Sequence, residues 1–460
     1  MKIVCSVKVL PSGELNPFDA AAYEAALRVE EAEVTLLSMG RENTRDLLSK
    51  LTRLGAKRAI LLTDPGFAGA DSLATAYALS EAIKKLSPDL ILCGRQSIDG
   101  DTAQVGPEMA EMLSLPLATC VYSFSFEGTA VKAQKAKSEL TLPLPALLTL
   151  ERSYELRLPS IFSRPGEVET WSLASLGADP ARCGTAGSRT RVLSTEEKTG
   201  GRRDCHFISP ADFPQTLAAL LRKETVTAEQ TLQKKLPFTR AVGETAAELA
   251  KAYFEEVETL DLLSPSLLAE KIAEKEAPVL FASDAWGREN APRVAAILSL
   301  GLCADCTSIE ERLGNPVFVR PAFGESKIAR VRCLSPIPMA TMRPRSPTGD
   351  LIVSLGRGAS ASIARGKAFA ARYGAELASS RGLVDDGKMP YSLQVGMTGR
   401  VVSPKVYIAL GISGAVHHLA GMENAGSIVA VNPDKKAPIF GYADIGILST
   451  AEEFFDALRI

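Results

Sequence analysis

The first 120 residues alternate between short apolar runs and longer segments with helical spacing, and this rhythm constrains the fold more than any other feature. The runs of strand length span 2–10, 33–38, 59–63 and 89–93. The segments with apolar residues three and four apart span 19–31, 44–54, 71–86 and 100–113. A βαβα alternation builds a parallel sheet with helices on both faces, so the predicted fold class is α/β.

After residue 119 the pattern changes. Runs with a period of two at 121–126 and 130–136 predict a hairpin around Glu127-Gly128. Residues 160–205 are rich in Gly, Ser, Arg and Pro, which predicts an extended arm or linker. Further helices are predicted at 214–223, 245–257, 266–275 and 290–300. Further strands are predicted at 278–283, 352–354, 406–409, 427–431 and 439–440, so a second α/β region begins near residue 352.

One segment of the first region has a counterpart later in the chain. DLILCG is followed by RQSIDGDTAQVGPEMAEMLSLPLATC, and PVLFAS is followed by DAWGRENAPRVAAILSLGLCADC. Both stretches predict a strand, a polar loop, a helix, then Leu-Ser-Leu and a short turn. A diverged duplication of one unit is favoured over the alternative that any two βα units look alike.

Composition excludes several classes of protein. The 52 basic and 54 acidic residues nearly cancel, which argues against nucleic-acid binding by bulk charge. Only three histidines occur, so a three-histidine zinc site and a serine–histidine catalytic triad are both disfavoured. Eight cysteines are too dilute for a disulfide scaffold, and the CxxC of Cys303 and Cys306 is interpreted as buried or incidental thiols. No apolar run reaches about 18 residues, so we expect a soluble, cytoplasmic protein without stable membrane insertion.

Two N-terminal loops are candidate ligand sites. The stretch 93–106, CGRQSIDGDTAQVG, lies between a predicted strand and a helix beginning near Asp101, where a helix N-terminus favours an anion such as phosphate. Gly100 permits close approach of the backbone, and Thr102 and Gln104 offer polar groups. The alternative is a well-capped loop without a ligand. For 16–19, Asn-Pro-Phe-Asp, local chemistry favours turn and capping roles.

The C-terminal region carries an ordered series of loop motifs. They are GRG at 356–358, SRGLVDDG at 380–387, QVGMTG at 394–399, GISGAVHH at 411–418, VNPD at 431–434 and ADIG at 443–446. Small residues, hydroxyls and single charges between apolar runs are typical of a backbone cradle for a large dinucleotide. Neither a GxxxxGK[ST] motif nor a strand-linked GxGxxG motif occurs.

With these motifs the chain resembles an electron transfer flavoprotein, as a fusion of a beta subunit (1 to about 224) and an alpha subunit (about 278 to 460). The resemblance implies two Rossmann-like (adenine nucleotide alpha hydrolase-like) modules forming a base, plus a C-terminal FAD-binding α/β domain. The implied domains are a nucleotide-binding domain with a C-terminal arm at 1–224, a helical linker with a truncated second module at 225–344, and the FAD-binding domain at 345–460. Residues 224–277 are expected to lack strands.

For the C-terminal domain the resemblance implies FAD. The implied contacts are Arg357, Ser380, Arg381, Val395, Gly396, Met397, Thr398, Ser413, Gly414, Ala415, Val416, His417, His418, Asn432 and Asp444. The guanidinium of Arg381 would lie against the isoalloxazine and stabilise negative charge on the reduced ring, Thr398 would bond its reactive nitrogen, and His418 would lie at the pyrimidine edge, with the same effect if protonated.

Taken singly, these residues have other readings. Arg381 fits a surface ion pair, His418 fits a core histidine, and Asp444 fits a cap or turn. Four positions depart from the family pattern and put the flavin potential in doubt: Met397, His417, Pro433 and Ile445.

For the N-terminal domain the resemblance implies a second nucleotide. The matching positions are Ser6, Asn16, Pro17, Phe18, Asp19, Met39, Asp99, Gly100, Asp101, Thr102, Ala103, Gln104, Val105 and Gly106. The ligand would be AMP in simple carriers, or a second FAD that meets NADH in electron-bifurcating members. The stretch 63–79 favours the second FAD.

The resemblance also implies a docking loop for an acyl-CoA dehydrogenase-like flavoprotein, with ferredoxin or flavodoxin as a further partner. Leu158 matches the family's leucine anchor, and the alternative is a Leu158 packed on its own domain. The implied function is electron carriage, with NADH-dependent bifurcation as an option. The alternatives are a non-redox adenine-nucleotide-binding module and a hydrolase acting on an adenylate.

Overall fold

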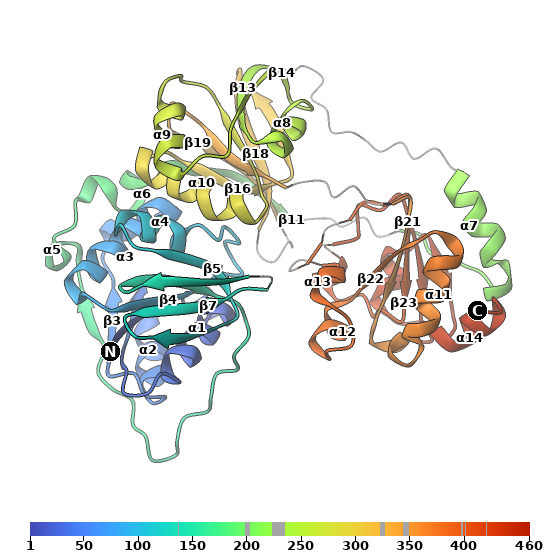
Figure 1. The fold of residues 1–460 in the computed structure, drawn as a ribbon, viewed down its shortest axis with the longest axis horizontal. Coiled ribbons are helices and arrows are strands. Elements are labelled where there is room, and N and C mark those ends of the chain that lie inside the picture. Colours follow the sequence, from blue (N-terminus) through green and yellow to red (C-terminus); the bar gives the residue numbers. More distant parts are fainter. Residues whose placement is uncertain are drawn as a thin grey trace. The chain divides into compact units, whose positions relative to one another are not determined.

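The computed structural model describes residues 1–136, 138–197, 203–222, 235–322, 327–343, 349–396, 399–400, 402–419 and 421–460. It forms two compact units (Figure 1). Unit 1 contains residues 1–195, 232–323 and 329–344, and unit 2 contains 196–231, 324–328 and 345–460. The predicted domain boundaries at 224/225 and 344/345 lie outside the described residues.

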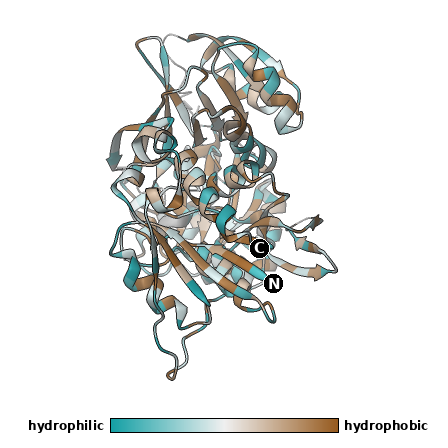
Figure 2. Ribbon diagram, turned by 90° about the vertical axis from the view of Figure 1, so that its left-hand side faces the viewer, coloured by the Kyte–Doolittle hydropathy of each residue, from teal (hydrophilic) through white to brown (hydrophobic). Residues whose placement is uncertain are grey.

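The N-terminal module of unit 1 is the predicted parallel sheet with helices on both faces. Its strand order is β10-β3-β2-β1-β4-β9-β5. The strands are β1 (Lys2–Ser6), β2 (Glu33–Met39), β3 (Arg58–Leu62), β4 (Leu90–Gly94), β5 (Leu117–Val121), β9 (Ala146–Leu150) and β10 (Glu169–Trp171). The main helices are α1 (Pro17–Leu27), α2 (Thr44–Thr52), α3 (Ser72–Leu86) and α4 (Val105–Met112). Helices α1 and α2 pack on one face and α3 and α4 on the other, so the strands are apolar on both sides (Figure 2).

The predicted hairpin is present in a separate antiparallel sheet. Strands β6 (Ser123–Glu127) and β7 (Ala130–Gln134) meet around Glu127-Gly128, and β8 (Glu139–Pro143) pairs with β7. The predicted arm contains the short edge strand β10 and two short helices, α5 (Leu173–Leu176) and α6 (Gly184–Gly187), before β11 (Thr190–Glu197).

The second module of unit 1 also has a parallel sheet, with the order β14-β13-β15-β20-β16. Its strands are β13 (Leu236–Val242), β14 (Phe254–Leu260), β15 (Val279–Ala282), β16 (Leu302–Cys306) and β20 (Met339–Met342). Its helices are α8 (Glu244–Ala250), α9 (Pro265–Ala273) and α10 (Ala285–Leu298). A four-stranded sheet adds β17 (Ser308–Arg312), β18 (Asn315–Ala322) and β19 (Lys327–Cys333) to β11.

The expectation that residues 224–277 lack strands is wrong, because β13 and β14 lie there. Strand β14, FEEVETL, is at the sheet edge, where its glutamates face solvent, so its composition imitates an exposed helix. The predicted helix 245–257 accordingly ends at Ala250. In the described part of the chain, this sheet has five parallel strands where the N-terminal sheet has seven.

The predicted duplication is visible in the backbone of both modules. Each copy ends its helix on a left-handed serine and has a left-handed residue at a β-bulge in the following strand. The matched pairs are Ser114 with Ser299, and Cys120 with Asp305. In both copies the bulge amide donates to a threonine hydroxyl of the neighbouring strand, Thr149 at 3.1 Å or Thr341 at 2.7 Å. Such irregular geometry at matched positions goes beyond generic βα similarity.

Unit 2 has a six-stranded parallel sheet in the order β12-β25-β24-β23-β21-β22. Its strands are β12 (His206–Phe207), β21 (Leu351–Leu355), β22 (Glu376–Ser379), β23 (Val406–Leu410), β24 (Ser427–Val431) and β25 (Ile445–Ile447). Its helices include α7 (Phe213–Arg222), α11 (Ile363–Tyr373), α12 (Arg381–Asp385), α13 (Val416–Leu419) and α14 (Ala451–Ala457). The predicted strand 439–440 is wrong, since Pro438–Tyr442 forms a 3-10 helix.

Residues 203–222, which the prediction groups with the first 224 residues, pack into unit 2. Strand β12 pairs with β25, and Phe213 of α7 is fully buried against Phe369 and Phe454. Among the residues that the structure describes, no helix is long and apolar enough to cross a membrane.

Candidate functional site

A cavity of about 920 Å³ opens in the N-terminal module at the carboxyl ends of β1, β3 and β4. Ten of the fourteen predicted N-terminal positions line it: Ser6, Asn16, Asp19, Met39, Gly100, Thr102, Ala103, Gln104, Val105 and Gly106. The other four, Pro17, Phe18, Asp99 and Asp101, do not. Phe18 is buried with the Arg95 guanidinium over its ring. The location agrees with the rule that open parallel sheets bind ligands beyond their strand ends.

Asp19 joins two strand ends below this cavity. Its Oδ1 accepts from the amide of Gly94 and its Oδ2 from the amide of Lys8, both at 2.8 Å. Burial raises the pKa of Asp19 to about 6, although these hydrogen bonds and the Lys8 charge oppose the shift. The predicted capping role is wrong for Asp19, which lies in the first turn of α1, whereas Asn16 occupies the N-cap position without a side-chain capping hydrogen bond.

The cavity wall also contains groups that the sequence did not single out. Lys8 lines it, with Nζ 2.7 Å from Asp99 Oδ2. Arg41 and Arg95 line it as well. The stretch 63–79, which the sequence did single out, contributes all of its residues up to Thr75 except Gly66, Leu73 and Ala74. The cations suit an anionic ligand. Asp71 is the N-cap of α3 and accepts a hydrogen bond from Ala74 N at 3.0 Å. The sequence predicted this cap, but it did not predict that the N-terminus of α3 faces a cavity.

The loop before α4 differs from its prediction. Helix α4 begins at Val105 rather than near Asp101, because Asp101 and Ala103 both have left-handed φ values, 50° and 55°. Gln104 is buried and its Nε2 donates to the carbonyl of Leu302 in the second module at 3.0 Å. The loop conformation therefore depends partly on contacts far away in the sequence.

In unit 2 the candidate site lies where the strand order reverses. Strands β21 and β23 are neighbours, β22 lies beyond β21, and β24 beyond β23, so the connections after β21 and β23 diverge. In doubly wound sheets a crevice forms at this switch point. The predicted motifs at 356–358, 380–387 and 411–418 directly follow β21, β22 and β23.

The glycines at this edge bring two loop backbones together. Gly358 N donates to Gly411 O at 3.1 Å, and a Cβ at Gly356 would collide with that same carbonyl. Gly411 and Gly414 have φ values of 63° and 91°, which favour glycine. The result is a surface of main-chain groups that a large ligand could approach closely.

Three charged or titratable side chains lie in these loops. Arg357 is exposed and packs over Gly382. Arg381 is partly exposed, and its Nε lies 3.1 Å from Asp385 Oδ2. This contact is the surface ion pair that the sequence offered as the alternative role of Arg381. His418 is buried, and its Nε2 lies 3.0 Å from the Tyr407 hydroxyl.

The ring of His418 is neutral near pH 7 in this structure, since burial lowers its pKa to about 4. Its Nδ1 is buried without a hydrogen-bond partner among the described residues. A buried nitrogen without a hydrogen-bond partner is energetically costly.

Most of the remaining predicted contacts lie along the same edge, whereas Asp444 precedes β25 and lies beside the first residues of β24, at the opposite edge of the sheet. Ser413 and Ala415 are exposed, Ser380 precedes α12, and Val395 and Gly396 are buried. Asn432 Nδ2 donates to Ile412 O at 3.0 Å, and its Oδ1 accepts from Asp434 N at 2.9 Å. Asp444 Oδ2 binds Arg203 and the Ile428 amide. Met397 and Thr398 lie outside the described residues, as do the side chains of Val416 and His417.

The loop around the predicted docking anchor is exposed and apolar. Leu158 is 90% exposed, so the alternative that it packs on its own domain is wrong, and Ile161 and Phe162 are 85% and 87% exposed. Arg157 makes a bidentate contact with buried Glu24, both distances being 2.9 Å. Three exposed apolar side chains on a loop that is fixed at its base form a candidate interaction surface.

Comparison with known proteins gives two family matches. An electron transfer flavoprotein domain matches residues 8–176 and 226–372, and an electron transfer flavoprotein FAD-binding domain matches 347–423. The N-terminal region is 39% identical to an electron transfer flavoprotein subunit beta of Megasphaera elsdenii, over 40% of this chain and 77% of the relative. The C-terminal region is 36% identical to a subunit alpha of Thermoanaerobacterium thermosaccharolyticum, over 37% of this chain and 66% of the relative. The chain is also 36% identical to the caffeyl-CoA reductase-Etf complex subunit CarD of Acetobacterium woodii, over 41% of this chain and 78% of the relative.

Proposed function

The chain belongs to the electron transfer flavoprotein family as a beta–alpha fusion, and from this premise we propose that it carries electrons between a dehydrogenase-type flavoprotein and a second redox partner. The observation that carries the proposal is the glycine-rich edge of unit 2 at the β21/β23 switch point. FAD is the ligand expected there, and it would supply one- and two-electron redox chemistry.

The residues of unit 2 fit such a group on two counts. The Gly356 and Gly411 backbones leave no room for side chains, and His418 Nδ1 is a buried polar atom without a described partner. We assign Arg357, Ser380 and Arg381 to the flavin end, where permanent guanidinium charges would favour negative charge on the ring. His418 would contribute as a neutral hydrogen-bonding group, not as a cation.

The loop 413–415 would serve the ribityl and phosphate groups with its backbone amides. Asn432 and Asp444 would hold the adenosine end. In the described part of the chain both contacts of Asp444 use Oδ2, which leaves Oδ1 for the ligand. Met397 and Thr398, which lie outside the described residues, keep their predicted roles as part of this proposal.

For the cavity of unit 1 we propose a second adenine nucleotide. Its volume of about 920 Å³ is at the upper end for ligand pockets, which favours FAD over AMP. With FAD in both sites, NADH is the electron donor of a bifurcating reaction. The similarity to a subunit of a caffeyl-CoA reductase-Etf complex supports this version, and AMP in the cavity would indicate a simple carrier.

Quantifying the nucleotides released on denaturation tests both assignments. Two FAD per chain supports the bifurcating type, and one FAD with one AMP supports the simple carrier. Protein that retains adenine nucleotides but never flavin would instead support the non-redox nucleotide-binding module.

We propose that the exposed loop carrying Leu158, Ile161 and Phe162 docks on the dehydrogenase partner. Such an anchor typically contributes about 2 kcal/mol, so Leu158→Ala should weaken electron transfer from an acyl-CoA dehydrogenase about thirtyfold without changing flavin content. Leu140→Ala, at a partly exposed leucine of β8, is the matched control. Equal rates for the two variants would remove the docking role.

A further inference from the structure

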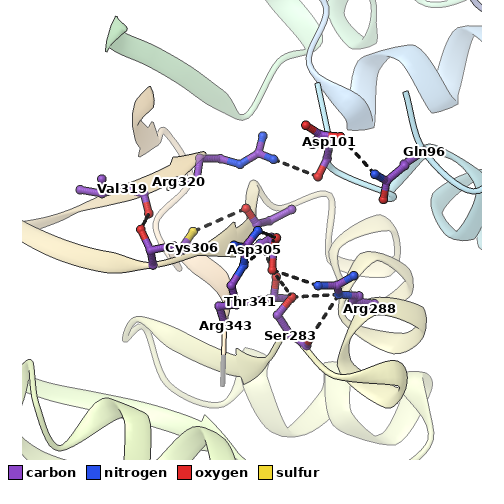
Figure 3. Close-up of polar contacts among 12 residues, drawn as sticks. Gln96, Asp101, Ser283, Arg288, Asp305, Cys306, Val319, Arg320, Thr341 and Arg343 are labelled. Atoms are coloured by element: carbon purple, nitrogen blue, oxygen red, sulfur yellow. Dashed lines mark hydrogen bonds and ion pairs between the residues drawn. The ribbon is translucent and has the colours of Figure 1, made fainter. Parts of the chain in front are cut away.

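Arg320 of the second module reaches a loop of the N-terminal module. It lies on β18, is 7% exposed, and its Nη2 donates to the carbonyl of Asp101 at 3.0 Å (Figure 3). Its Nε is buried without a partner among the described residues. The contact joins residues 219 apart in the sequence, within unit 1.

The charge of Arg320 is not balanced by an ion pair in the described part of the chain. Two other arginines of the same module, Arg288 and Arg343, share the carboxylate of Asp305. Arg320 has one neutral carbonyl oxygen instead. A buried guanidinium with so little compensation is unfavourable unless something else uses its charge or its hydrogen bonds.

The loop that Arg320 holds forms part of the cavity wall. Asp101 lies between Gly100 and Thr102, which both line the cavity. Its left-handed backbone, φ 50°, is unfavourable for a residue with a side chain. Local bonds support it, from its own amide to Ser97 O at 2.8 Å and from Gln96 Nε2 to its Oδ1 at 3.1 Å. Arg320 adds the support that comes from outside the module.

We propose that Arg320 is a positioning and specificity residue for the N-terminal nucleotide site. Its hydrogen bond holds the loop 99–103 in the shape that lines the cavity, and its buried charge behind that loop favours ligands bearing phosphate over neutral nucleosides. This inference rests on the proposed nucleotide site in unit 1.

The test measures binding of AMP and of adenosine to full-length protein that retains its C-terminal flavin and has been dialysed free of the N-terminal nucleotide. Arg320→Met keeps the apolar stem and removes the charge and the donors. It should weaken AMP binding about tenfold, the loss expected for one charged hydrogen bond, and weaken adenosine binding less. Arg320→Lys keeps the charge, so it should recover the preference for AMP over adenosine. Arg332→Met, at an exposed arginine of the neighbouring strand β19, should leave both affinities unchanged.

Two results would overturn the inference. One is AMP affinity within twofold of wild type in Arg320→Met. The other is an equal loss for AMP and adenosine, which would indicate a purely structural role. Both leave the nucleotide site itself intact. Failure of the wild-type protein to bind AMP, adenosine or FAD in unit 1 would overturn the proposed second site together with this inference.

Discussion

The two modules of unit 1 share one repeated core, and the described cavity lies at the strand ends of the N-terminal module. Backbone bonds set the equivalence: Arg95 N donates to Leu150 O as Ser283 N donates to Met342 O. By this register Gly94 corresponds to Ala282, and Cys93 to Phe281. The strand end that lines a cavity in one module therefore carries larger side chains in the other.

The second module also has a charged side chain, Asp305, at the position where the first module has the thiol of Cys120. Asp305, the counterpart of Cys120, accepts from Ser283 Oγ at 2.8 Å, Arg288 Nη2 at 3.1 Å and Arg343 Nε at 3.0 Å (Figure 3). Burial opposes ionisation, but the two guanidinium groups hold the pKa of Asp305 well below its usual range. An internal ion-pair network therefore lies at this strand end of the second module.

The third difference is one βα unit. In the N-terminal sheet β3 and α3 follow β2, and most residues of the loop between β3 and α3 line the cavity. In the second module β14 is the edge strand, and α9 leads directly to β15. A nucleotide-sized cavity in this architecture thus needs an additional wall as well as small residues at the strand ends.

The largest effect is expected from breaking the ion-pair network. Asp305→Ala leaves Arg343 and Arg288 without their carboxylate, and should lower the free energy of unfolding by about 3 kcal/mol. Cys120→Ala, at the matched position, should cost about 1 kcal/mol because only a small apolar contact is lost. Urea unfolding followed by tryptophan fluorescence measures both. Equal losses would show that the network does not stabilise the second module.

A smaller loss of stability is expected from exchanging the residues at the ends of β4 and β15, where Gly94 and Ala282 differ by one methyl group. A Cβ at Gly94 would lie 2.5 Å from Asp19 Oδ1 and 2.7 Å from Asp19 N, so Gly94→Ala should cost about 2 kcal/mol through overpacking. It should also remove the N-terminal nucleotide, since Asp19 must move. Ala282→Gly should cost about 1 kcal/mol and leave the nucleotide content unchanged. A Gly94→Ala protein that keeps its nucleotide would show that the glycine does not shape the site.

The sequence predicted the elements whose periodicity is local and strong. Strands β1 to β4 of the N-terminal sheet, the hairpin at Glu127-Gly128 and the duplicated unit follow from apolar spacing and turn residues, whereas β5, β9 and β10 were not predicted. The buried, free thiols of Cys303 and Cys306 were also predicted correctly. These features depend on residues close to one another in the chain.

What failed depends on partners far away in the sequence or on position within a sheet. The left-handed Asp101 is held by Arg320, and no local pattern reveals such a contact. Strand β14 was missed because an edge strand tolerates glutamates. Lys8 and Arg41 were missed as cavity residues because single charges in loops carry no distinctive spacing.

The smallest effect extends the comparison to the two candidate ligand sites, which should respond to acid in opposite directions. The pKa of Asp19 is raised to about 6, so between pH 6.5 and 5.5 the folded chain takes up a proton that the unfolded chain does not. Wild type should gain about 0.7 kcal/mol relative to Asp19→Asn over this interval. The pKa of His418 is lowered to about 4, so there the unfolded chain takes up the proton, and wild type should lose about 1 kcal/mol relative to His418→Gln.

The measurement is urea unfolding of the three proteins at both pH values. Both tryptophans, Trp171 and Trp286, lie in unit 1, so their fluorescence follows the Asp19 effect, while far-ultraviolet circular dichroism also follows unit 2. A shift of the same sign for both variants would contradict the assignment of one buried acid and one buried neutral base. Opposite signs would show that burial disfavours the charged form of each titrating group, whichever its sign.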